Sequence, residues 1–152
     1  MGSPTHKKWV VFHIFKSFFS RHNFTYPINI CSLNYLLMKV LIVADNPEVR
    51  QMIKRFIQDI ADEIVECADG DDILTAYKLF RPDWVLLDIE LKRLGGFVVG
   101  KKIMKSFPNA SIVFLASFDD ANLRIIAQEI GAKGFVLKEN LASLREILAE
   151  RV

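Results

Sequence analysis

The chain has 152 residues, of which 51% are hydrophobic and 25% are charged, and such a chain suits one globular domain with a sizeable core. Its formal net charge is +2, but residues 38–152 are net acidic, which argues against nucleic-acid binding. Its two cysteines, Cys31 and Cys67, argue against a disulfide framework or a zinc site. From this cysteine usage we expect a reducing, cytoplasmic setting. No apolar run approaches the roughly 20 residues of a membrane span.

The charge is distributed unevenly along the chain. The first 37 residues hold four of the 20 basic residues and none of the 18 acidic ones, so the remainder has a formal net charge of −2. All three histidines also fall in this first segment. We therefore expect an N-terminal extension over residues 1–37 and one folded domain over residues 38–152.

Three interpretations of the extension remain open. Polar residues in "WVVFHIFKSFFSRHNF" recur at helical spacing, which is typical of a basic amphipathic helix on an anionic membrane or in a partner's groove. Alternatively, the segment is not part of the functional protein, because "MGSPTHKK" resembles a cloning remnant and Met38 stands where a start codon is expected. The third interpretation is extra packing onto the domain. A secretory signal is disfavoured, because no small-residue cleavage site follows the apolar stretch.

From Met38 onward, short apolar runs alternate with segments of helical period. The runs are mostly continuous, as expected for parallel strands that are covered on both faces. Strands are predicted over residues 40–44, 63–68, 83–88, 111–116 and 134–138. Helical faces begin at Val49, Ile73, Val99, Leu123 and Leu141. Asn46-Pro47 is a helix start signal, and Pro108 and Gly131 are stop signals for the third and fourth helices.

Five strands that alternate with five helices predict an α/β domain with a parallel sheet, right-handed crossovers and helices on both faces. In open sheets of this kind, functional sites lie beyond the carboxyl ends of the strands. Asp45 follows the first predicted strand, Asp88 ends the third and Lys138 ends the fifth. We expect these two carboxylates and one ammonium group to converge at one edge of the sheet.

Such a group of charges suits phosphoryl chemistry. Two neighbouring carboxylates repel each other, and a hard cation such as Mg²⁺ relieves the repulsion by binding their oxygens. Together with a lysine it forms a pocket for a phosphoryl group, which an aspartate accepts as an acyl phosphate. Each residue alone has a simpler explanation, as a helix cap or a solvated lysine. A nucleotide- or FMN-binding enzyme is disfavoured, because no Gly, Ser or Thr cluster follows the first strand.

These residues resemble the receiver domain of two-component response regulators, the CheY-like family, over residues 38–152. The resemblance rests on "VLIVADNPEVR", "ADGDDILTAYKLFRPDWVLLDIEL", "GGFVVGKKI", "IVFLASFDD" and "GAKGFVLKEN", in order and at family spacing. It implies a flavodoxin-like three-layer sandwich with a five-stranded parallel sheet of order 2-1-3-4-5 and five helices. It also implies a phosphorelay protein rather than an enzyme, which receives phosphate from a sensor histidine kinase or phosphotransfer protein and signals to a downstream effector.

The resemblance assigns roles to individual residues. Asp88 matches the phosphoacceptor, and Lys138 matches the lysine that pairs with the phosphoryl oxygens. The implied Mg²⁺ ligands are the carboxylates of Asp45 and Asp88 and the backbone carbonyl of Glu90. Phe135 matches the aromatic switch residue. Homodimers through the fourth and fifth helices are typical of the family, and we expect no direct DNA binding by this chain.

Several positions depart from the family pattern. Ala44 replaces the first of two acids, and Ala116 replaces the switch threonine or serine. Ser117 follows Ala116, but alternation of side chains along a strand argues against its hydroxyl as a substitute. Lys92 replaces a proline, and Gly95 replaces an acidic residue. Two functions therefore remain open: weakened phosphorylation of Asp88 with a change of interaction surface, or a phosphorylation-independent interaction module (a pseudo-receiver).

Overall fold

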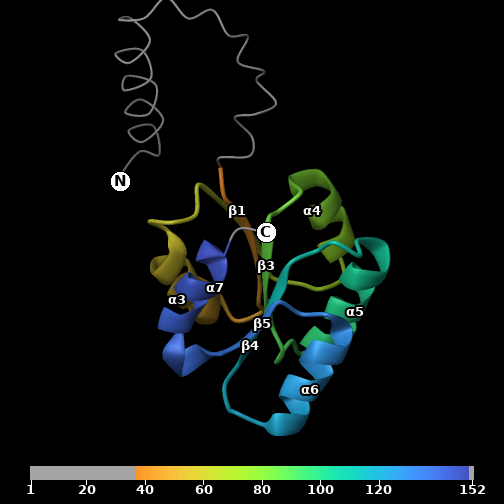
Figure 1. Ribbon diagram of the computed structural model, residues 1–152. Coiled ribbons are helices and arrows are strands. Elements are labelled where there is room, and N and C mark those ends of the chain that lie inside the picture. Colours follow the sequence, from red (N-terminus) through yellow and green to blue (C-terminus); the bar gives the residue numbers. More distant parts are fainter. Residues whose placement is uncertain (1–36, 151–152) are drawn as a thin grey trace, which may run out of the picture. The chain divides into compact units, whose positions relative to one another are not determined.

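The computed structural model describes residues 37–150 (Figure 1). The predicted extension and its amphipathic helix lie outside the described residues, apart from Leu37. The strands are β1 (Lys39–Val43), β2 (Glu63–Cys67), β3 (Trp84–Asp88), β4 (Ile112–Ala116) and β5 (Gly134–Leu137). The α-helices are α3 (Pro47–Ile57), α4 (Ile73–Phe80), α5 (Gly96–Ser106), α6 (Ala121–Ile130) and α7 (Ala142–Ala149), and the short 3₁₀ helix η2 (Lys138–Asn140) precedes α7.

The five strands form one parallel sheet in the order β2-β1-β3-β4-β5, which confirms the predicted topology. Helices α3 and α7 cover one face of the sheet, and α4, α5 and α6 cover the other (Figure 1). Strand side chains alternate between these two layers: Ile42 and Leu86 pack with α3 and α7, whereas Leu87 and Phe114 pack with α4, α5 and α6. The domain is therefore a three-layer sandwich.

Three strands end one residue earlier than the sequence predicts. β1, β2 and β5 end at Val43, Cys67 and Leu137, because the chain leaves the sheet to start the next turn. After β1, the Asn46 side chain accepts a hydrogen bond of 2.9 Å from the Glu48 N–H and caps α3, with proline at the first helical position. The residues after the strands are thus free to carry the polar groups of a site.

The predicted helix stop signals act as expected. Gly131 ends α6 in the left-handed conformation, with φ of 90°, and α5 ends at Ser106, before Pro108. Asp120 caps the start of α6 by accepting hydrogen bonds from the next turn. None of the helices within residues 37–150 combines the length and apolar character that a membrane crossing requires.

Gly96 brings the first turn of α5 against the backbone of Asp88. A Cβ atom at this position would overlap the Asp88 carbonyl oxygen and lie 2.6 Å from the Ile89 Cα. We therefore expect Gly96→Ala to lower the free energy of unfolding by about 1–3 kcal/mol, because rigid backbone must move to accommodate the methyl group. Chemical denaturation measures this loss, and Val98→Ala, an exposed position in the same helix, is the control. Equal stability of the two variants would contradict the steric explanation.

Candidate functional site

Asp88 and Lys138 meet at the carboxyl edge of the sheet. Asp88 ends β3 and Lys138 directly follows β5, and the Lys138 Nζ lies 2.9 Å from the Asp88 Oδ1. Among the described residues, Asp88 is the sole buried polar or charged residue, at 2% exposure. A buried carboxylate is stable only when it is paired, and Lys138 supplies the pairing charge. The same oxygen accepts a hydrogen bond of 2.9 Å from the Glu90 N–H.

The Glu90 side chain binds the same lysine. Its Oε2 lies 2.7 Å from the Lys138 Nζ and accepts a hydrogen bond of 2.7 Å from the Ser117 Oγ. The Lys138 Nζ also donates a longer hydrogen bond, of 3.4 Å, to the Ser117 Oγ. We call Asp88, Glu90, Ser117 and Lys138 the Lys138 cluster. It joins the loops that follow β3 and β4 to the end of β5.

The pKa values of the cluster reflect this pairing. The hydrogen bond from Lys138, followed by that from Ser117, holds the pKa of Glu90 below its usual range. For Lys138, burial is the strongest single influence and favours the neutral amine, but the hydrogen bonds to Glu90 and Asp88 outweigh it together, so the pKa of Lys138 is raised. Lys138 and Glu90 are therefore both charged at neutral pH.

The Ser117 hydroxyl lies in the site, although the alternation of side chains along a strand argued against it as a substitute for the missing hydroxyl. β4 ends at Ala116 and the chain bends at Ser117, so the alternation of side chains along a strand does not apply there. The hydroxyl reaches Lys138 and Glu90. Ala116 is fully buried and presents only a methyl group. The hydroxyl of the site thus comes one residue later than the family pattern places it.

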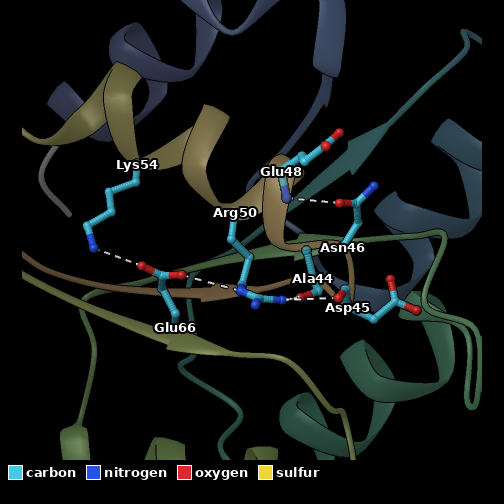
Figure 2. A network of polar contacts seen from close by, with 7 residues as sticks. All are labelled: Ala44, Asp45, Asn46, Glu48, Arg50, Lys54 and Glu66. Atoms are coloured by element: carbon cyan, nitrogen blue, oxygen red, sulfur yellow. Dashed lines mark hydrogen bonds and ion pairs between the residues drawn. The ribbon is translucent and has the colours of Figure 1, made fainter.

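Arg50, from α3, fixes the backbone that carries Asp45. Its Nη1 donates hydrogen bonds to the carbonyl oxygens of Ala44 and Asp45, the latter at 3.1 Å, and its Nε lies 3.3 Å from Glu66 Oε2 (Figure 2). Glu66 also pairs with Lys54 at 2.8 Å, and this hydrogen bond is the main reason why the pKa of Glu66 is lowered. The Asp45 carboxylate points away from this network (Figure 2).

The Asp45 carboxylate instead faces the loop between β3 and α5. Its Oδ2 accepts a hydrogen bond of 2.9 Å from the backbone N–H of Lys92, whose side chain is exposed. A proline at this position, as in the family pattern, has no N–H to donate. Asp45 also borders a cavity of about 200 Å³, beside which Arg93 forms an ion pair of 2.8 Å with Asp69. The replacement of the family proline by Lys92 therefore provides a backbone hydrogen bond to Asp45, the acid that remains after β1.

The residues that the resemblance assigns to Mg²⁺ supply two carboxylates, of Asp45 and Asp88, and the carbonyl of Glu90. Within residues 37–150, no three or more His, Cys, Asp or Glu side chains are grouped so that they could hold a metal ion. The Glu90 carboxylate is bound to Lys138, so only its backbone carbonyl is left for the predicted role. Mg²⁺ in phosphoryl-transfer sites typically keeps waters and uses one or two carboxylates together with phosphate oxygens. Asp45 and Asp88 fit this pattern, and we expect weak binding because Ala44 supplies no carboxylate.

The Lys92 hydrogen bond gives a direct test of Asp45 as a ligand. We expect Lys92→Pro to strengthen Mg²⁺ binding about threefold to tenfold, because it removes an N–H that competes for the carboxylate. Isothermal titration measures the affinity. Lys92→Ala is the matched control, since it removes the ammonium group and keeps the N–H. An equal gain in both variants would assign the effect to the side-chain charge and contradict the competition.

Phe135, the predicted switch residue, lies in β5 and is half-buried against the α4, α5 and α6 layer. The Arg124 guanidinium, from α6, lies 4.8 Å from the centre of its ring. Such a cation–π contact links α6 to the strand that leads to Lys138. The role of Phe135 as a switch continues to rest on the resemblance.

Sequence reasoning missed two contacts of the site. It used only the backbone carbonyl of Glu90 and not its carboxylate, and the conformation of a loop side chain leaves no periodic signal. It also missed the Lys92 N–H, although a lysine in place of a proline signals that a backbone donor has been gained. Both contacts arise in the loop that follows Asp88.

The comparisons with known proteins agree in one family. A family model described as the response regulator receiver domain matches residues 40–149. The "Uncharacterized transcriptional regulatory protein YxjL" of Bacillus subtilis is 34% identical over 106 residues, which cover 68% of this chain and 49% of the relative. The "Chemotaxis protein CheY" of Thermotoga maritima is 35% identical over 101 residues, which cover 66% of this chain and 84% of the relative. This chain spans about half the length of the first curated relatives that it matches.

Solved structures give the same result. A LuxR-family two-component response regulator from Aurantimonas sp. has a TM-score of 0.67 and 28% identity, over 76% of this chain and 87% of that one. The BeF3-activated receiver domain of Klebsiella pneumoniae RstA has a TM-score of 0.64 and 30% identity, over 74% of this chain and 99% of that one. Both likenesses extend over the described domain.

Proposed function

Because this chain belongs to the response regulator receiver domain family, we propose that it accepts a phosphoryl group on Asp88 with Mg²⁺ and changes its interaction surface in response. The observation that supports this most directly is the 2.9 Å contact between Lys138 and the nearly buried Asp88. The contact places a fixed cation beside the acceptor oxygen, where the charge of an incoming phosphoryl group must be balanced.

In the proposed reaction, a carboxylate oxygen of Asp88 attacks the phosphorus atom of the donor. The bond between phosphorus and the leaving group breaks, and the leaving group keeps the electron pair. Lys138 pairs with the phosphoryl oxygens, and the Glu90 N–H holds the Asp88 carboxylate in place. Asp45, Asp88 and the Glu90 carbonyl would hold Mg²⁺, which when bound supplies positive charge against the repulsion between carboxylate and phosphoryl group.

The test is incubation with acetyl phosphate and Mg²⁺, followed by intact-mass measurement and peptide mapping. We expect an addition of one phosphoryl group at Asp88 that chelation of the metal suppresses and hydroxylamine removes. Asp88→Asn is the control and should remain unlabelled. A wild-type protein without labelled Asp88, at a donor concentration that labels another receiver domain, would refute the proposal.

A second candidate is a phosphorylation-independent interaction module. It is favoured by the fully buried methyl groups of Ala44 and Ala116, which stand where the family has an acid and a hydroxyl. The two candidates predict different responses to beryllofluoride, a phosphoryl mimic. Shifts of backbone NMR signals in β4 and at Phe135 support phosphorylation-dependent switching, and their absence at saturation supports the interaction module.

We propose the remaining properties from the family. The donor is a sensor histidine kinase or a phosphotransfer protein, and the output is contact with a downstream effector protein in the cytoplasm. The chain is a phosphoryl acceptor rather than an enzyme that turns over a separate substrate, and it makes no direct contact with DNA. The fourth and fifth helices of the domain, α6 and α7, are the expected surface of a homodimer, which sedimentation with and without beryllofluoride would reveal.

A further inference from the structure

The Glu90 carboxylate occupies a distinctive place in the Lys138 cluster. The Lys138 Nζ lies 2.9 Å from Asp88 Oδ1 and 2.7 Å from Glu90 Oε2, so one ammonium group bridges the proposed acceptor and a second carboxylate. The Glu90 N–H, bound to Asp88 Oδ1, anchors the backbone from which this side chain extends. Glu90 is thus held beside the acceptor through both its backbone and its side chain.

The partners of Glu90 Oε2 are those that a phosphoryl group on Asp88 requires. This single oxygen is bound by a lysine ammonium and by the Ser117 hydroxyl, each at 2.7 Å. A phosphoryl oxygen carries negative charge and accepts hydrogen bonds from the same two kinds of group. A carboxylate and a phosphoryl group cannot both take these donors without bringing two anions together.

Exposure shows which partner is able to leave. The side chain of Lys138 is 12% exposed, and that of Glu90 is 40% exposed. Glu90 therefore lies on the solvent side of the lysine and is free to turn outward into water. Lys138 is paired on its buried side with Asp88, whose side chain is 3% exposed, so it is less free than Glu90 to turn into solvent.

We propose that the Glu90 carboxylate occupies the place of the phosphoryl group in the unphosphorylated domain and must release Lys138 and Ser117 before Asp88 is phosphorylated. The inference rests on the proposed phosphorylation of Asp88 and names the residue of this chain that limits it. Glu90 is a positioning residue: it forms no bond to phosphorus and acts by holding Lys138.

With acetyl phosphate, the reaction balances without Glu90. An Asp88 oxygen forms a bond to phosphorus, the bond from phosphorus to the acetyl oxygen breaks, and acetate leaves with the electron pair. Lys138 and Ser117 exchange the Glu90 carboxylate for phosphoryl oxygens, and Glu90 moves into water as an anion. No proton is transferred, and no oxidant or reductant is needed.

The test compares Glu90→Ala and Glu90→Gln with the wild type. We expect Asp88 to be labelled about tenfold faster in Glu90→Ala, because a charge-assisted contact no longer has to be broken, and Glu90→Gln to be intermediate. Glu139→Gln is the matched control: Glu139 is exposed, follows Lys138 in the chain and forms no ion pair with it among the described residues. NMR of the Lys138 ammonium group gives a second readout, since its protons should exchange with water faster once Glu90 is removed.

The outcomes separate the two proposals. Equal labelling of Asp88 in the wild type and Glu90→Ala overturns the role of Glu90 and leaves the phosphorylation of Asp88 supported. An equal gain in Glu139→Gln, or an unchanged Lys138 signal in Glu90→Ala, also overturns it, because the gain then reflects general charge. No labelling of any variant overturns both proposals.

Discussion

We expect the double variant Ala44→Asp/Ala116→Thr to be labelled by acetyl phosphate about a hundredfold faster than the wild type. Each substitution restores one group of the family pattern: an acid near the proposed metal site and a hydroxyl at the end of β4. A hydrogen bond that involves a charged group contributes about 1.5–3 kcal/mol, and about 1.4 kcal/mol in a barrier changes a rate tenfold. The two gains together give the expected factor.

The backbone at position 44 is already fixed. The Ala44 N–H donates a hydrogen bond of 3.2 Å to the Cys67 carbonyl, and Arg50 binds the Ala44 carbonyl. The added side chains nevertheless enter fully buried positions, so each costs about 1–3 kcal/mol of stability, and thermal unfolding must show that the variants remain folded. The single variants should each give about a tenfold gain, and Asp88→Asn in the double variant should abolish labelling. A folded double variant that is labelled at the wild-type rate would show that other residues limit the site.

The second large effect is expected for Lys138→Met, which keeps the length of the side chain and removes its charge. We expect the free energy of unfolding to fall by about 3 kcal/mol, because the buried Asp88 carboxylate loses its cation. Labelling of Asp88 should fall by at least about a hundredfold, since the phosphoryl charge is no longer paired. Lys133→Met, an exposed position that has no ion pair among the described residues, is the control for both measurements.

The pH dependence of this stability difference has a definite sign. The pKa of Glu90 is lowered, so its contribution is present above its pKa in the unfolded chain and is lost as the pH falls through the lowered value. The pKa of Lys138 is raised, so its contribution is present below its unfolded value and is lost as the pH rises through the raised one. The wild type and Lys138→Met should therefore differ most near neutral pH and less in acid and in alkali. A difference that grows in acid would contradict the pairing.

The fold and the centre of the site could be predicted from sequence for a simple physical reason. Continuous apolar runs fixed the parallel strands, and the carboxyl ends of parallel strands share one edge, which brings Asp88 and Lys138 together. The ends of three strands were predicted one residue too late, because hydrogen bonds of the following turn decide where a strand ends. The error at Ser117 arose in this way, since alternation was applied one residue beyond the strand.

The loop after Asp88 could not be predicted in the same way. Neither the Glu90 carboxylate nor the Lys92 N–H belongs to a periodic element, and their partners are 48 and 47 residues away along the chain. Such contacts depend on the three-dimensional position of the loop, which Gly96 sets by its close approach to Asp88. The sequence therefore identified the charged residues at the strand ends, but not the loop groups that bind to them.

The ion pairs around α3 have a mechanical consequence. Arg50 and Lys54 fasten this helix to the ends of β1 and β2, and Arg145 binds α7 to Asp59, after α3, at 2.7 Å. On this face of the sheet, ion pairs and hydrogen bonds thus connect α3 to the strands and α7 to the end of α3. On the other side, Arg124 of α6 pairs with Asp119, in the turn that follows Ser117, and lies over the Phe135 ring. The side chains of this ion pair are about half exposed, so it holds α6 less firmly than the more buried Arg50–Glu66 pair holds α3. We therefore expect the domain to be more rigid around α3 than around α6. Phosphorylation should change the rate of backbone amide exchange along α6 and leave it unchanged along α3.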